Sequence, residues 1–236
     1  MIAGRFANKI IGGTATFALV QPLQGTSMAI SDPPERSKQT LSFAQYIEQE
    51  SLSDVKHHFH HGVLIDVAGA SLEHNIICGN LIRAMGNALD DSDCVVMPGD
   101  MKVFVSPNVA YYPDIVVVCA EPLVTLGEAL QNPVLVAEVL SPSTAAFDRG
   151  GKFREYRSVP SLRHILFIEQ DSPVIEHYER NAAEAWTLRG ENDALQQNLE
   201  LTVSGHRASL PLSKIYRNVT FPAVAPSAID PATIQE

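Results

Sequence analysis

The chain has 236 residues, of which 45% are hydrophobic and 19% are charged. This length and composition are typical of one globular domain with a core large enough to fold alone. The net charge of −10 argues against strong non-specific DNA binding, because affinity for nucleic acid depends largely on Lys and Arg side chains that neutralise phosphates. Carboxylates that hold metal ions would add negative charge that the bound ions offset.

The two ends of the chain differ in composition from the rest. Residues 1–26 are basic and then mildly apolar, as in a signal peptide, but no small-residue cleavage site clearly follows. Met28 begins a polar segment typical of a protein start, so we expect residues 1–27 to be disordered or to precede the true start. The domain is expected over 28–221, with a disordered tail over 222–236. No apolar run reaches the ~18 to 20 residues of a membrane span, so we expect no membrane partner.

The three cysteines, Cys78, Cys94 and Cys119, lie singly in apolar surroundings. None belongs to a CxxC pair, so the spacing predicts neither a disulfide framework nor a thiolate zinc site. A reducing cytoplasm is the expected compartment.

A helix, a hairpin and a second, longer helix are expected first along the chain. Residues 41–49 predict a short helix. Gly62 marks the turn of a hairpin within residues 57–69. Residues 72–89 carry apolar side chains at helical spacing, and Ser71 precedes them as a natural cap.

Strands dominate the middle of the chain. Two segments are nearly continuous apolar runs, which are typical of strands buried on both faces and indicate a sheet covered by helices. A helix is expected over 148–157, before Pro160. The expected strands are 94–98, 100–106, 114–120, 133–141, 163–170 and 173–180. This order of elements predicts an α/β or α+β fold with a mixed sheet flanked by helices.

Two carboxylates stand beside or within the apolar strands. Asp114 lies at the start of one strand and Glu138 lies inside the next apolar run, between Ala137 and Val139. A carboxylate in such surroundings is costly unless it is paired or holds a cation. Structural salt bridges would satisfy both residues, but a Mg²⁺ or Mn²⁺ site is the alternative, because hard cations favour oxygen ligands.

A basic residue follows on the predicted helix. Asp148 and Lys152 are four positions apart, a spacing that an ordinary surface ion pair would also explain. If Lys152 instead points toward the two carboxylates, its ammonium could stabilise charge on a phosphate or help to position an attacking water.

Several segments in the middle of the chain, taken in order, resemble those of a known protein family. The segment YYPDIVVVC, followed by PVLVAEVLSPST, DRGGKFREYRSVPS and LRHILFIEQ, resembles the Uma-two family of restriction-endonuclease-like proteins, within the PD-(D/E)xK superfamily. The similarity extends over about residues 41–221 and is strongest over 100–180.

The resemblance implies a restriction endonuclease-like core that hydrolyses DNA phosphodiester bonds with Mg²⁺ or Mn²⁺, with a homodimer as the expected assembly. Asp114 matches the aspartate of the PD element and Glu138 the acidic residue of (D/E)xK. The lysine expected two places later is replaced by Leu140, and Lys152 matches the family's lysine on the following helix. Asp100 matches a further acidic position.

The histidines mark a departure from the family pattern. His58 stands where the family usually has a glutamate, and imidazole is a poorer Mg²⁺ ligand than a carboxylate. His57, His58, His60 and His61 also suggest a zinc site, but without a Cys or closely spaced acidic residues they favour an exposed polar hairpin. His74 opens the long helix, either near the site or as a surface residue.

Three functions are therefore compatible with the sequence. The first is a metal-dependent endonuclease with Asp114 and Glu138 as metal ligands and Lys152 as a catalytic residue. The second is a non-catalytic nuclease fold that serves as a binding or dimerisation module, and the third is a hydrolase of another phosphate substrate. The chain lacks GxGxxG, GxxxxGK[ST] and GxSxG, so dinucleotide, P-loop and serine-hydrolase functions have no motif support.

Overall fold

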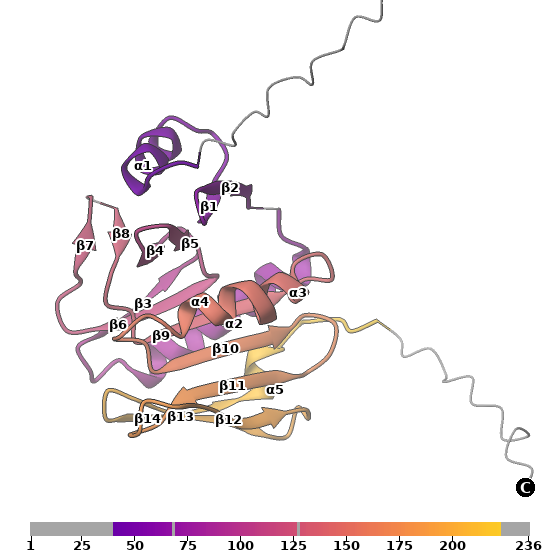
Figure 1. Cartoon of the computed structure of the whole chain (residues 1–236). Helices are drawn as coiled ribbons and strands as arrows, with labels where there is room; N and C mark the ends of the chain where they lie inside the picture. The colour runs from indigo at the N-terminus through magenta and orange to yellow at the C-terminus, as the bar shows by residue number, and fades with distance from the viewer. Residues whose placement is uncertain (1–39, 68, 127, 223–236) are drawn as a thin grey trace, which may run out of the picture. The chain divides into compact units, whose positions relative to one another are not determined.

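The computed structural model describes residues 40–67, 69–126 and 128–222 (Figure 1). The predicted extension over 1–27 and, apart from Pro222, the predicted tail lie outside the described residues. None of the helices within the described ranges has the length and apolar character needed to cross a membrane.

A six-stranded mixed sheet forms the centre of the described region, in the order β12-β11-β10-β9-β6-β3. Only the β9–β10 pair is parallel in this sheet, and the other neighbours are antiparallel. Every residue of β6 and β9 is buried, as the apolar runs predicted. The strands are β3 (Cys94–Pro98), β6 (Ile115–Cys119), β9 (Leu135–Leu140), β10 (His164–Glu169), β11 (Ile175–Arg180) and β12 (Trp186–Asn192).

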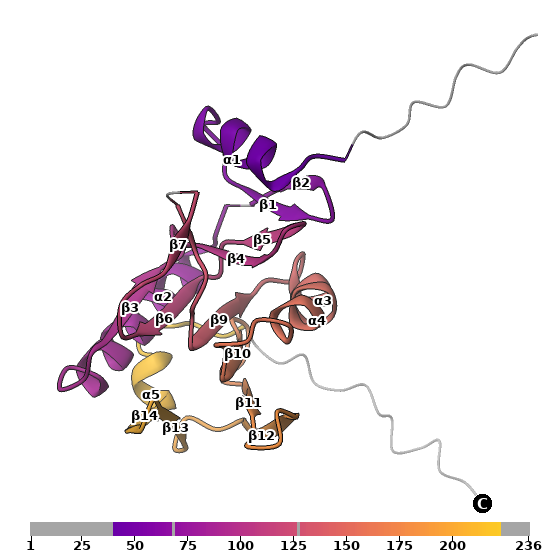
Figure 2. The same ribbon diagram turned by 60° about the vertical axis from the view of Figure 1, so that its left-hand side comes forward.

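Helices cover both faces of this sheet, and the period of two along β9 separates the two cores. Ala137 and Val139 face α2 (Leu72–Ala88), together with β13 (Asn198–Val203), β14 (His206–Pro211) and α5 (Leu212–Ile215). Val136 and Leu140 face the opposite layer, which contains Tyr156. That layer is α3 (Ala145–Phe147), a π-helical turn η1 (Asp148–Lys152) and α4 (Phe153–Tyr156), and Figure 2 shows it across the sheet from α2.

A second sheet has the order β2-β1-β5-β4-β8-β7, and α1 (Phe43–Ser51) packs against it through Phe43 and Tyr46. Ser42 caps α1 in a capping box with Gln45. The hairpin turn at Gly62 is confirmed, with positive φ angles at His61 and Gly62. The strands are β1 (His57–His60), β2 (Val63–Asp66), β4 (Lys102–Ser106), β5 (Val109–Tyr111), β7 (Val124–Thr125) and β8 (Ala129–Leu130).

Several elements differ from the sequence prediction, which also did not include β5, β7, β8, β12 and α5. The helix expected over 148–157 is broken into a π turn and a short α-helix, so its first residues do not follow a regular 3.6-residue period. The hairpin of β13 and β14 was not predicted, although alternate residues of both strands are buried against α2.

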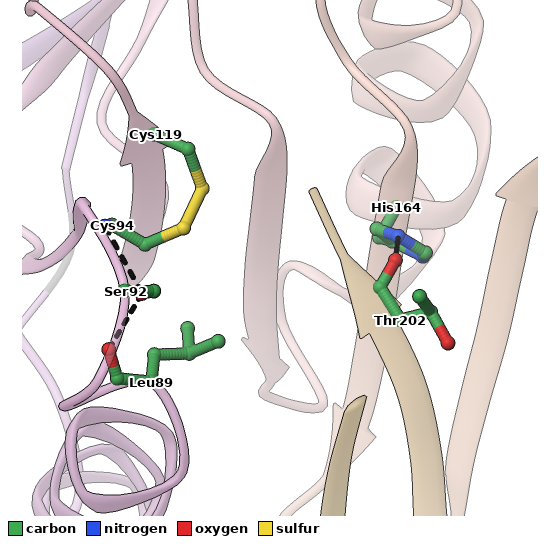
Figure 3. The surroundings of a disulfide bond; sticks show 6 residues. All are labelled: Leu89, Ser92, Cys94, Cys119, His164 and Thr202. Carbon is green, nitrogen blue, oxygen red and sulfur yellow. Dashed lines mark hydrogen bonds between the residues drawn. A yellow bond between two sulfur atoms is a disulfide. The ribbon is translucent and has the colours of Figure 1, made fainter. Parts of the chain in front are cut away.

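The expectation of unpaired cysteines is wrong for two of the three residues. Cys94 and Cys119 lie opposite each other on β3 and β6 and form a disulfide (Figure 3). They are 25 residues apart, and only the antiparallel register of the two strands brings them together, which spacing alone does not reveal. Cys78 is free. The cytoplasmic compartment stays a prediction, and a structural disulfide is uncommon there.

The disulfide should contribute measurably to stability. Cross-linking a loop of this length lowers the entropy of the unfolded chain, so reduction should lower the free energy of unfolding by about 3 to 4 kcal/mol. Urea unfolding of the oxidised and reduced protein measures this difference. Cys78→Ser, which retains the disulfide, should show the same loss on reduction, whereas Cys94→Ala/Cys119→Ala should show none. A midpoint that does not move on reduction of the wild type would contradict the bond.

A buried pair of histidines connects the central sheet to the C-terminal hairpin. His164 on β10 and His177 on β11 approach through Nδ1 and Nε2 at 3.1 Å. Nε2 of His164 lies 3.1 Å from the carbonyl oxygen of Thr202 on β13 (Figure 3). Burial lowers the pKa of both imidazoles, that of His177 to about 3. The pair is therefore neutral at pH 7.

The histidine pair makes stability depend on pH. Because the folded-state pKa values lie below the usual 6.5, the contribution is present above pH 6.5 and is lost as the pH falls toward the folded values. The free energy of unfolding should fall between pH 7 and 5, by up to about 1.4 kcal/mol per pH unit for each histidine. His177→Gln should flatten this slope in urea unfolding, and equal slopes in the two proteins would contradict the assignment.

Candidate functional site

Two carboxylates on neighbouring inner strands lie opposite each other, near the start of β6 and the end of β9. Asp114 immediately precedes β6 and Glu138 lies within β9. The antiparallel register pairs Ile115 with Ala137, so one step further along places Asp114 opposite Glu138. The backbone N–H of Val139 donates to Asp114 Oδ2 at 2.7 Å, which holds that carboxylate against β9. Both residues line a cleft of about 520 Å³.

Glu138 is buried and bonded through both carboxyl oxygens. Lys152 Nζ donates to Oε2 at 3.0 Å, and the hydroxyl of Tyr156 donates to Oε1 at 2.6 Å. Burial raises the pKa of Glu138 to about 8, against the opposing effect of Lys152, and Asp148 and Asp114 raise it further. The protonation state of Glu138 therefore depends on nearby positive charge, such as the Lys152 ammonium, which favours the ionised carboxylate.

The π turn brings Asp148 and Lys152 into the same buried space. Their side chains are 3% and 5% exposed, respectively. Lys152 Nζ lies 2.9 Å from Asp148 Oδ1 as an ion pair, but the geometry is not that of a hydrogen bond. Burial lowers the pKa of Lys152, but the carboxylates of Glu138 and Asp148 outweigh it and raise the pKa overall. The surface pair considered as an alternative is therefore wrong, since Lys152 points inward at Glu138.

Gly151 allows the π turn to pack tightly. A Cβ atom at this position would lie 2.6 Å from the ring of Phe147, so any larger residue would displace that ring. Irregular π turns occur frequently at functional sites. Here the π turn carries the buried charged side chains, Asp148 and Lys152.

Asp114 is also in contact with the first turns of α2. Nε2 of His74 lies 3.2 Å from Asp114 Oδ2. One turn later, the sulfur of Cys78 lies 3.6 Å from Nδ1 of the same ring. The Ser71 side chain caps α2 by accepting from the backbone N–H of His74, so this cap fixes the first turn beside the cleft. His74 thus lies at the site rather than on an open surface.

His58 lines the cleft, and Asp100 lies at its rim. Nδ1 of His58 accepts from the backbone N–H of Tyr112 at 3.2 Å, and burial lowers the pKa of this imidazole to about 2, with Lys152 adding to the effect. His58 is therefore neutral. The Asp100 side chain is 81% exposed and pairs with Lys56, whereas Glu138 is buried.

The zinc cluster considered for the hairpin histidines does not form among the described residues. His57 contacts Glu50, His60 contacts Tyr111 and His61 contacts Glu155. The exposed-hairpin alternative is also wrong in part, because the middle of β1 is buried.

Sequence reasoning did not identify Tyr156 and Gln170 as members of the site. Tyr156 lies one helical turn after Lys152, a spacing that could have indicated a shared face. Gln170 directly follows β10, lines the cleft and accepts from Ser71 Oγ at 2.9 Å. Its position at the end of a buried strand beside β9 was the available indication.

The chain is similar in sequence to a protein family and to known proteins over most of its length. The Uma2 family, described as "Putative restriction endonuclease", matches residues 43–211, which include all the residues of the cleft named above. The "Uncharacterized protein sll1609" of Synechocystis sp. is 36% identical over 167 residues, which cover 70% of this chain and 93% of that protein. The "Uncharacterized protein slr1290" of the same organism is 33% identical over 193 residues, which cover 81% of this chain and 100% of that protein.

A solved structure shares the fold. The crystal structure of "a putative nuclease belonging to DUF820 from Anabaena variabilis" aligns with a TM-score of 0.58 at 12% identity, covering 75% of this chain and 97% of that one. At this identity the likeness concerns the fold alone. The family match over more than half of the sequence, with two relatives above 30% identity, settles the membership: the chain belongs to the Uma2 family and has a restriction endonuclease-like core.

Proposed function

We propose that this protein is a metal-dependent endonuclease that hydrolyses phosphodiester bonds in DNA. The observation that carries the proposal is the burial of Glu138 and Asp148 around Lys152, next to Asp114 in one cleft. Buried charges of this number are costly to retain for stability alone. The family and the fold support a nuclease-type role.

The residues fit a hard divalent cation. Asp114 and Glu138 would hold Mg²⁺ or Mn²⁺, because they present carboxylate oxygens to the same cleft. When Asp114, Glu138 and Asp148 are ionised, three negative charges face the single positive charge of Lys152. A divalent cation would balance the remainder and favour the ionised form of Glu138, whose pKa burial raises to about 8. When bound, such an ion supplies a hydroxide-like nucleophile and stabilises charge on the phosphate oxygens.

Lys152 takes the part that the missing lysine at position 140 would have. Its ammonium stays protonated between Glu138 and Asp148, from where it would orient the attacking water or neutralise a phosphate oxygen. Tyr156 and Asp148 are positioning residues, since Tyr156 binds Glu138 and Asp148, which also lines the cleft, pairs with Lys152.

The acidic charge of the chain bears on the choice of substrate. With a net charge of −10, the protein should bind nucleic acid through its metal site and local contacts rather than through a broad basic surface. DNA is proposed as the substrate, bound with weak non-specific affinity that depends only weakly on salt because few phosphates are neutralised, and a homodimer as the form that cuts both strands.

Nicking of supercoiled plasmid tests the proposal. Purified protein should nick the plasmid with Mg²⁺ or Mn²⁺ and not with EDTA. Glu138→Gln and Asp114→Asn should reduce the rate to background, and Lys152→Met should reduce it by about 100-fold or more, because each removes a charge required in the cleft. Asp171→Asn, an acidic change at an exposed position after β10, should retain wild-type activity.

Circular dichroism spectra should show that all four variants remain folded. Metal-dependent nicking that persists at the wild-type rate in both Glu138→Gln and Asp114→Asn would overturn the assignment of the site. A folded wild type that nicks with none of the metals would favour the binding-module alternative.

A further inference from the structure

A second set of possible metal ligands lies beside the proposed catalytic centre. One ligand atom each from His74, Cys78 and Asp114 lie within 4.8 Å of one another. His74 and Cys78 are four residues apart on α2 and so share one face of the helix. Asp114 reaches them from the start of β6. All three line the cleft.

We propose that His74, Cys78 and Asp114 form a zinc-selective inhibitory site that shares Asp114 with the proposed catalytic centre. Zn²⁺ bound here would withdraw Asp114 from Mg²⁺ and stop cleavage. The inhibitory part rests on the proposed endonuclease function, but binding of Zn²⁺ to these three residues does not.

The donor set selects a soft or borderline metal. Thiolate and imidazole favour Zn²⁺ and related transition metals, whereas Mg²⁺ takes oxygen ligands. Two ligands at i and i+4 on a helix, joined by a carboxylate, are a recurrent zinc arrangement. Three protein ligands leave a fourth position for water.

The distances suit coordination after a small contraction. In a tetrahedral zinc site neighbouring ligand atoms lie about 3.3 to 3.7 Å apart, as follows from zinc–ligand distances of about 2.0 to 2.3 Å. His74 Nε2 and Asp114 Oδ2 are already 3.2 Å apart. Cys78 Sγ now contacts Nδ1 of the same ring, so its side chain must turn toward Nε2 and Asp114 for all three residues to hold one ion.

Cys78, His74 and Asp114 also resemble a catalytic triad of nucleophile, base and acid. The electrostatics around the Cys78 thiol oppose that role. Burial raises the pKa of the Cys78 thiol, and the carboxylates of Asp114 and Glu138 raise it further. An activated cysteine requires the opposite shift. A metal cation offsets both effects, because it favours the thiolate and compensates the carboxylates.

Cobalt provides a direct probe of the thiolate ligand. Co²⁺ replaces Zn²⁺ in such sites, and a cysteine thiolate bound to it gives a charge-transfer band in the near ultraviolet. Titration of the oxidised wild-type protein with Co²⁺ should produce this band with one ion per chain, and an equivalent of Zn²⁺ should abolish it. The band should be absent in Cys78→Ser and weakened at least 10-fold in His74→Gln.

Two control variants separate this site from the rest of the chain. Cys94→Ala/Cys119→Ala should retain the band, because those sulfurs form a disulfide in the native protein and are not thiolates. Glu138→Gln should also retain it, since Glu138 is not one of the three ligands. A folded wild type without the band, or a band that persists in Cys78→Ser, would overturn the zinc site.

The inhibitory part has its own measurement. Zn²⁺ at one equivalent per chain should reduce Mg²⁺-dependent nicking at least 10-fold in the wild type, and Cys78→Ser should nick normally and resist Zn²⁺. Equal inhibition of both proteins would overturn the inhibitory role while the cobalt band still reports on binding. Because the band needs no nuclease activity, its result stands even where the proposed endonuclease function fails.

Discussion

The ion pair between the carboxylate of Glu138 and the ammonium of Lys152 is the interaction on which the rest of the site depends. Both side chains are almost fully buried, and the removal of two charges from water costs several kcal/mol unless further polar groups satisfy them. Tyr156 and Asp148 supply those groups. Asp148 and Lys152 both come from the π turn, where both are buried.

The sequence predicts the centre of this arrangement well, for physical reasons. A carboxylate between Ala137 and Val139 on an apolar strand needs a partner or a cation, so Glu138 stands out without any structure. The hairpin at Gly62 and the helix after Ser71 were equally accessible, because glycine and serine have specific backbone roles at turns and caps. These features depend on local chemistry.

The features that sequence reasoning missed depend on contacts between distant segments. Cys94 meets Cys119 only through the register of β3 against β6, and the π turn departs from the helical period that a pattern search assumes. The buried side of β13 and β14 is set by α2, which comes more than a hundred residues earlier. For His74 the sequence left two positions open, and the fold decides for the one beside Asp114, where this residue links the proposed catalytic centre to the proposed zinc site.

If Asp114 and Glu138 form one divalent-cation site, Mg²⁺ should stabilise the folded protein against thermal unfolding. A ligand that binds only the folded state stabilises it by about 2.7 kcal/mol at 100 times its dissociation constant, which corresponds to a rise in Tm of about 5 to 10 °C for a domain of this size. We expect this rise in the wild type and its loss in Asp114→Asn and in Glu138→Gln. A wild-type Tm that does not respond to Mg²⁺ or Mn²⁺, or an equal rise in both variants, would contradict it.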